Sequence, residues 1–99
     1  MYFVVLRRAG PLWDRESSLE DQVDWERHAA FMDALVAEGV VVLGGPLEDE
    51  RRVVLVVEAA SKSDAQERLS RDPWAGSHLV LESIDEWTIR LDGRVQPRG

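Results

Sequence analysis

Cysteine is absent from this 99-residue chain, so disulfides, thiolate nucleophiles and metal sites built on cysteine are excluded. Positive charge is scarce as well, because 12 basic side chains stand against 19 acidic ones and leave a formal net charge of -7. Such a chain repels phosphate backbones and anionic headgroups, so we expect no nucleic acid and no membrane surface as a partner. Long hydrophobic runs are missing too, and the longest, 40–43 and 53–57, fall far short of the roughly 20 residues of a membrane span. We therefore expect a cytoplasmic protein.

The hydrophobic content of 44% suits one small domain, which we place at residues 1–91, followed by a flexible tail at 92–99. A chain of this length has room for a single core. Its marginal size favours burial against a second subunit, because an interface adds apolar area that the monomer cannot supply.

Strand-like and helix-like segments alternate along the chain. Ser17 and Glu20 have the spacing of a capping box, and Gly39 is placed to end the helix that would follow. The residues from Leu79 onward alternate strictly, which predicts one long strand with Leu79 and Leu81 on one side and Val80 and Ile84 on the other. The predicted elements are a strand at 2–7, a helix from 17 to 39, a hairpin of strands at 40–43 and 53–57, a helix from 61 or 63 to 69, and a strand at 79–91.

The resulting order, βαββαβ, is that of the ferredoxin-like or split βαβ fold of the α+β class. This fold has an antiparallel sheet with both helices on one face. The other face is left exposed, and the sheet of a second copy is the simplest element that could bury it. We therefore expect a homodimer formed through the open sheet face.

His28 lies in a predicted helix, on the same face as the apolar residues at i+3, i+4 and i+7, which include Phe31. An imidazole can take or give a proton near neutral pH, so His28 is a candidate acid or base. The alternative is a histidine held in the core by a hydrogen bond to a neighbour. Spacing alone does not decide between them.

The stretch RDPWAG, residues 71–76, follows the second predicted helix. Pro73 holds the backbone in a turn, which leaves the Asp72 carboxylate free to cap or to reach a neighbour, while Trp74 offers a flat apolar surface. In a split βαβ fold the two helices lie side by side, so Asp72 could approach His28 and fix its tautomer. The simpler reading is a helix stop with a tryptophan anchor.

Two further motifs are weaker. The stretch GGPL, residues 44–47, allows a close backbone approach by a ligand at Gly45 and Pro46, although a bulge or turn explains it equally. His78 is either a second site histidine or, more simply, a surface residue. Two histidines without helical i, i+4 spacing or a carboxylate set give only a weak signal for a metal site, and we expect neither a metal nor another cofactor.

Taken together, HAAFMDALVAEGVVVLGGPL and RDPWAGSHLVLESIDEWTI resemble the YCII-related family in the order and spacing of their motifs. The resemblance covers roughly residues 2–91. It implies a dimeric α+β barrel of ferredoxin-like subunits, with an active site built on the positions of His28 and Asp72. It also implies proton transfer of lyase or isomerase type on a small metabolite, cyclic or aromatic in kind. The first loop is longer than in the shortest members, and the polar GSH after DPWA departs from the usual small apolar run.

Two classes of function follow. As an enzyme, the chain would use His28 to move a proton and Asp72 to orient the imidazole, with Trp74, Phe31, Gly45 and Pro46 as candidate substrate-binding residues. As a non-catalytic module, it would hold a small molecule in the same pocket or serve only for dimerisation. The fold by itself does not choose between these classes, because one scaffold hosts many functions.

Overall fold

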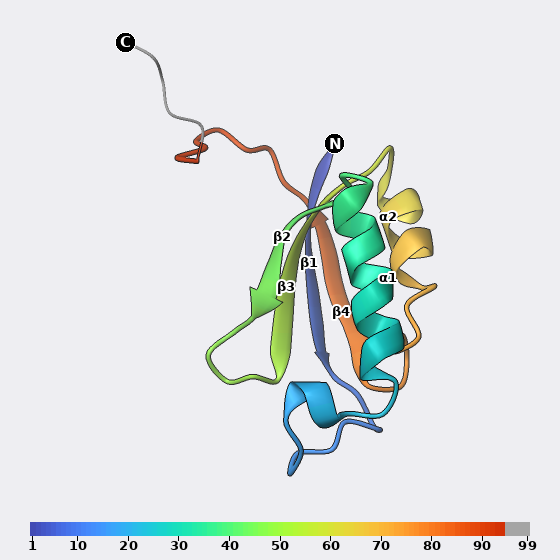
Figure 1. The fold of residues 1–99 in the computed structure, drawn as a ribbon. Helices are drawn as coiled ribbons and strands as arrows, with labels where there is room; N and C mark the ends of the chain where they lie inside the picture. The colour runs from blue at the N-terminus through green and yellow to red at the C-terminus, as the bar shows by residue number, and fades with distance from the viewer. Residues whose placement is uncertain (95–99) are drawn as a thin grey trace.

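The computed structural model describes residues 1–94 as a four-stranded sheet with two helices against one of its faces (Figure 1). The strands and helices follow the predicted βαββαβ order, with one short 3-10 helix inserted in the first loop. The elements are β1 (Tyr2–Ala9), η1 (Leu19–Asp21), α1 (Trp25–Ala37), β2 (Val41–Pro46), β3 (Arg52–Glu58), α2 (Lys62–Leu69) and β4 (Leu79–Glu86).

The sheet has the order β2-β3-β1-β4, and each neighbouring pair is antiparallel. Val5 at the centre lies opposite Leu55 of β3 and Ile84 of β4, so one row of buried side chains crosses three strands. Directly opposed residues share a face of a sheet. This face packs against both helices through Leu35 and Leu69, which confirms the predicted ferredoxin-like architecture.

The opposite face of the sheet is covered by neither helix (Figure 1). Leu43 lies opposite Val56 on this side and is 50% exposed. A shallow cavity of about 230 Å³ lies between these two residues and the segment that follows β4, which contributes Trp87 and Leu91. Pairing of this face with a second copy remains a prediction.

The start of α1 differs from the prediction, because the helix begins at Trp25 and not near Ser17. The Ser17 hydroxyl donates to the Asp14 carboxylate instead of capping a helix. The buried side chain of Gln22 donates to the carbonyls of Asp14 and Ser17, which folds this stretch into a closed loop. Asp24 then turns the chain into the helix with a left-handed φ of 63°.

Two other predicted helix boundaries are confirmed. Gly39 has a φ of 78° directly after α1, and its N–H binds the carbonyl of Val36, as expected of a glycine that ends a helix. At α2 the cap is Ser61, whose side chain accepts a hydrogen bond of 3.0 Å from the backbone N–H of Asp64. Both signals are local, which is why the sequence shows them.

The last strand is shorter and less regular than predicted. It ends at Glu86, and the pairing with β1 shifts so that Leu6 faces Ser83 while Arg7 faces Leu81. Glu82 is therefore the extra residue of a bulge. Ile84 consequently joins Leu79 and Leu81 on the helix side, which corrects the strict alternation expected from the sequence.

The hairpin forms as predicted, but β2 continues through the two glycines to Pro46. The turn is made by Leu47 and the four charged residues 48–51, as the charged stretch between the two strands predicts, and Glu50 has a φ of 57°. Gly44 lies so close to the core that an added Cβ would come within 2.6 Å of Leu55 Cδ2. The GGPL stretch is thus a strand end with a close approach and not a turn.

Beyond β4, the chain runs away from the sheet (Figure 1), and Arg94 binds Asp92 through two side-chain hydrogen bonds. Most of the predicted tail, residues 95–99, lies outside the described residues. Within residues 1–94 no helix is both long and apolar enough to cross a membrane.

Candidate active site

The candidate site is built first on Asp72, which lies just after α2 and is 4% exposed. Its backbone closes a turn in which the N–H of Ala75 binds the Asp72 carbonyl. Pro73 favours this bend, and the Asp72 side chain accepts the N–H of Trp74 at 2.9 Å. The turn therefore orients the carboxylate inward, toward α1 and β1.

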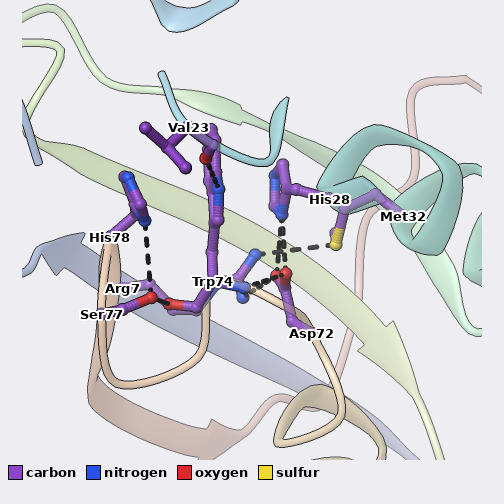
Figure 2. Close-up of polar contacts among 8 residues, drawn as sticks. All are labelled: Arg7, Val23, His28, Met32, Asp72, Trp74, Ser77 and His78. Carbon is purple, nitrogen blue, oxygen red and sulfur yellow. Dashed lines mark hydrogen bonds and ion pairs between the residues drawn. The ribbon is translucent and has the colours of Figure 1, made fainter. Parts of the chain in front are cut away.

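His28 comes from the first turns of α1 and is 8% exposed. Its Nδ1 lies 2.8 Å from Oδ1 and 2.9 Å from Oδ2 of Asp72. Because an ionised carboxylate only accepts hydrogen bonds, Nδ1 must carry the proton of this contact. The structure thus brings together the two residues that the sequence proposed as a pair (Figure 2).

The other ring nitrogen, Nε2 of His28, has no hydrogen-bond partner among residues 1–94. Within residues 1–94 the single buried side-chain nitrogen or oxygen that lacks a partner is Arg7 Nε. If Nε2 of His28 were fully buried, it would be a second buried atom without a partner. Nε2 is therefore accessible to solvent. A neutral His28 with its proton on Nδ1 presents the lone pair of Nε2 as a base.

Arg7 is the residue of the site that the sequence reasoning missed. It lies on the helix side of β1, is 3% exposed, and donates from Nη1 to Asp72 Oδ2 at 2.8 Å. A signal was present, because Phe3, Val5 and Arg7 alternate on one side of the predicted strand.

The hydrogen bonds around Asp72 determine its protonation. Burial by itself raises the pKa of the carboxyl group, because the charged form loses its hydration. The hydrogen bonds from His28, from the Trp74 N–H and from Arg7 outweigh that effect and hold the pKa of Asp72 below its usual value. Asp72 is therefore an anion at neutral pH and serves as an acceptor.

Trp74 is the most enclosed residue of the site, at 1% exposed. The His28 ring stacks on one of its faces, with centroids 4.0 Å apart, and the His78 ring covers the other at 5.0 Å. Its Nε1 donates to the carbonyl of Val23 (Figure 2). Neither face of Trp74 is free for a substrate, so its position fits a wall that supports His28 better than a stacking platform.

His78 is buried, contrary to the expectation of a surface residue. It is held by the stack on Trp74, and its Nδ1 lies 3.4 Å from the hydroxyl of Ser77. Its carbonyl accepts the N–H of Gly10, which ties the first loop to the segment before β4. Among the described residues, no hydrogen bond or ion pair joins His78 to Asp72, and Trp74 lies between His78 and His28.

The remaining candidate residues lie on α1 and β2. Phe31 packs on the core and lines a cavity of about 200 Å³ between α1 and α2. Gly45 lies opposite Val54 on the open side of the sheet. Pro46 lies on the same side as Arg7 but two strands away, with Val53 between them. Gly45 and Pro46 therefore lie on strand β2, away from the pair, whereas Phe31 lies one helical turn after His28 on α1.

Within residues 1–94 no group of three or more histidine, aspartate or glutamate side chains could hold a metal ion. The described side chains around Asp72 combine an imidazole with an open nitrogen, a carboxylate that orients it, and a buried guanidinium behind the carboxylate. Such a set is suited to proton transfer.

A family model for the YCII-related domain matches residues 1–88. The chain belongs to the YCII-related family. No curated protein matches it. Among solved structures, this YCII-related domain is similar to 5-chloro-2-hydroxyhydroquinone dehydrochlorinase from Burkholderia phenoliruptrix AC1100, determined in complex with 2,5-dihydroxybenzoquinone. The two share 20% sequence identity over 89% of this chain and 94% of that chain, with a TM-score of 0.64, so the likeness establishes a common fold.

Proposed function

We propose that this protein is a cytoplasmic acid-base enzyme of lyase or isomerase type that acts on a small cyclic or aromatic metabolite. The observation that carries the proposal is the contact of His28 Nδ1 with both oxygens of Asp72, at 2.8 and 2.9 Å. The two residues are 44 positions apart in the chain. A buried carboxylate placed against an imidazole is a common way to prepare a general base.

In the proposed reaction His28 takes a proton from the substrate on Nε2 and becomes an imidazolium. Asp72 keeps the Nδ1 proton in place and stabilises the positive charge that develops on the ring. In an elimination, the electron pair left on the substrate expels the leaving group. In an isomerisation, the same imidazolium returns the proton to another position.

The class of substrate rests on the structural neighbour. That enzyme is a dehydrochlorinase of a hydroxylated aromatic ring, and its complex holds a quinone. At 20% identity the activity is not carried over by the fold alone. The neighbour does supply two probes, 2,5-dihydroxybenzoquinone for binding and 5-chloro-2-hydroxyhydroquinone for turnover.

The first test measures chloride release from 5-chloro-2-hydroxyhydroquinone by the wild type, His28→Asn and His78→Asn. The two histidines form a matched pair, since both are buried and both stack on Trp74, but only His28 contacts Asp72. We expect His28→Asn to lose at least about 100-fold in kcat/KM and His78→Asn to keep its activity. Equal losses in both variants would contradict the proposed role of His28.

Binding separates the enzyme from the alternative of a non-catalytic module. Titration with 2,5-dihydroxybenzoquinone, followed by calorimetry, should give saturable binding in the wild type and in His28→Asn. Saturable binding without turnover of any hydroxylated aromatic substrate would favour a binding module. The absence of both would leave a dimerisation module as the better description.

We further propose that two copies of this chain pair through the open face of their sheets. Supporting this, Leu43 is half exposed, and Trp87 and Leu91 extend the apolar surface beyond β4. Analytical ultracentrifugation should find a dimer that Leu43→Asp converts to monomers. Val36→Asp is the control, because Val36 is similarly exposed, at 56%, but lies on α1. A dimer that survives Leu43→Asp would refute this interface.

A further inference from the structure

Arg7 places a full positive charge in the interior of the molecule. Its Nη1 binds Asp72 Oδ2 at 2.8 Å, its Nη2 meets the Met32 sulfur at 3.7 Å, and its Nε has no partner in the described part of the chain. A buried guanidinium in this setting is costly, because Nε has lost water without replacement and Nη2 meets only a sulfur, which is a weak acceptor. A leucine or methionine would fill this strand position with a smaller loss of hydration free energy. The buried charge therefore suggests a role other than packing.

We propose that Arg7 is a positioning residue for the His28 and Asp72 pair. Its charge holds Asp72 as an oriented anion, and the anion in turn holds neutral His28 in the tautomer that leaves Nε2 open. The catalytic part of this inference rests on the proposed function. The ionised state of Asp72 and the tautomer of His28 can be measured without any substrate.

The geometry of the carboxylate supports this role (Figure 2). Oδ1 of Asp72 accepts the Trp74 N–H at 2.9 Å, and Oδ2 accepts Arg7 Nη1 at 2.8 Å. Each oxygen is thus anchored by a donor other than His28. The carboxylate cannot turn, and His28 Nδ1 meets both oxygens at nearly equal distances. Without Arg7, Oδ2 would be held by His28 alone.

The charges of the cluster lead to the same role. The groups that meet the Asp72 carboxylate are Arg7 from β1, His28 from α1 and the Trp74 N–H of its own turn, while His78 lies beyond Trp74. Arg7 and Asp72 cancel when His28 is neutral. When His28 takes a proton, the cluster gains a unit of positive charge at the moment when the substrate is left as an anion. Such a site stabilises the charge that develops in proton abstraction.

The test compares Arg7→Met with Arg8→Met by NMR of the ligand-free protein. Arg8 is the matched control, because it is the next residue of β1 and loses the same charge from an exposed position. The readouts are the carbon signal of the Asp72 carboxyl group as a function of pH and the nitrogen signals of the His28 ring. In Arg7→Met we expect the pKa of Asp72 to rise and His28 to populate both neutral tautomers. In Arg8→Met we expect the wild-type values of both.

Arg7→Lys is a second variant for the same NMR measurements. It provides a test even if Arg7→Met does not fold. A lysine keeps the positive charge at this position, so we expect the low pKa of Asp72 and the single His28 tautomer to be retained. The proposal is overturned if Arg7→Lys loses both, if folded Arg7→Met changes neither, or if Arg8→Met changes them equally. None of these outcomes depends on turnover, so a protein that lacks the proposed activity can still confirm or refute the role of Arg7.

Discussion

The rings of His28 and Trp74 lie face to face, with centroids 4.0 Å apart and planes inclined by 8°. This contact fixes the plane of the imidazole, while the Asp72 carboxylate fixes its rotation within that plane. Trp74 is itself anchored by its Nε1 hydrogen bond to the Val23 carbonyl at 2.7 Å. The candidate base is therefore held by stacking and by hydrogen bonding, which is the rigidity that a catalytic group requires.

Asp72→Asn should destabilise the protein at neutral pH by about 3 to 5 kcal/mol, because it leaves the Arg7 charge buried without a partner. The measurement is urea unfolding at pH 7. The exposed Asp85 supplies a control, and Asp85→Asn should change the free energy of unfolding by less than about 0.5 kcal/mol.

The cost of Asp72→Asn should also depend on pH. The pKa of Asp72 is lower in the folded chain than in the unfolded one, so its carboxylate contributes stability above the unfolded value of about 3.9. That contribution is lost as the pH falls through the folded pKa. The difference between wild type and Asp72→Asn should therefore shrink below about pH 4. A difference that stays constant between pH 7 and pH 3 would show that the ionisation of Asp72 does not stabilise the fold.

Trp74→Phe should lower the free energy of unfolding by about 1 to 3 kcal/mol, because the Val23 carbonyl loses its buried donor and the stack of rings becomes smaller. Trp25→Phe is the comparison, since Trp25 is only half buried and lies at the edge of the cluster, 5.9 Å from Trp74. Thermal unfolding should show the larger loss for Trp74→Phe. The reverse order would place the anchor of the site at Trp25.

Gly10→Ala should be destabilising because the chain passes close to the segment before β4. A Cβ at Gly10 would lie 2.3 Å from the Ser77 carbonyl oxygen, a backbone atom that can move only with its segment. We expect a loss of about 1 to 3 kcal/mol. Gly45→Ala is the control, because nothing lies within 4 Å of its Cβ position and its φ is ordinary. Denaturant unfolding of the two variants should separate them clearly, and equal stability would contradict the close approach.

Gly39→Ala tests the end of α1 by a different mechanism. An added Cβ would meet nothing within 4 Å, so the cost comes only from the φ of 78°. We expect a loss of about 1 to 2 kcal/mol. Asparagine tolerates this backbone region better, so Gly39→Asn should lose less in the same thermal unfolding experiment. If both substitutions were neutral, the left-handed conformation would not be required.

Local signals predicted much of the fold correctly. The apolar run of β3, the glycine after α1 and the cap at Ser61 act over a few residues, so they can be identified directly along the chain. The expected start of α1 was wrong because a capping box is also a local pattern, and here Gln22 offers the same backbone a better set of hydrogen bonds. The bulge at Glu82 was missed since it depends on how β4 meets β1.

By itself, the sequence determined the order of the elements, the ferredoxin-like class and the pairing of His28 with Asp72 as candidates, because periodicity and turn chemistry are properties of neighbouring residues. Only the tertiary structure decided that Arg7 belongs to the site and that histidines cover both faces of Trp74. The contact of Arg7 with Asp72 joins positions 65 residues apart. A contact of that range exists only after the sheet and helices have packed, and burial then makes a charged side chain part of the site instead of the surface.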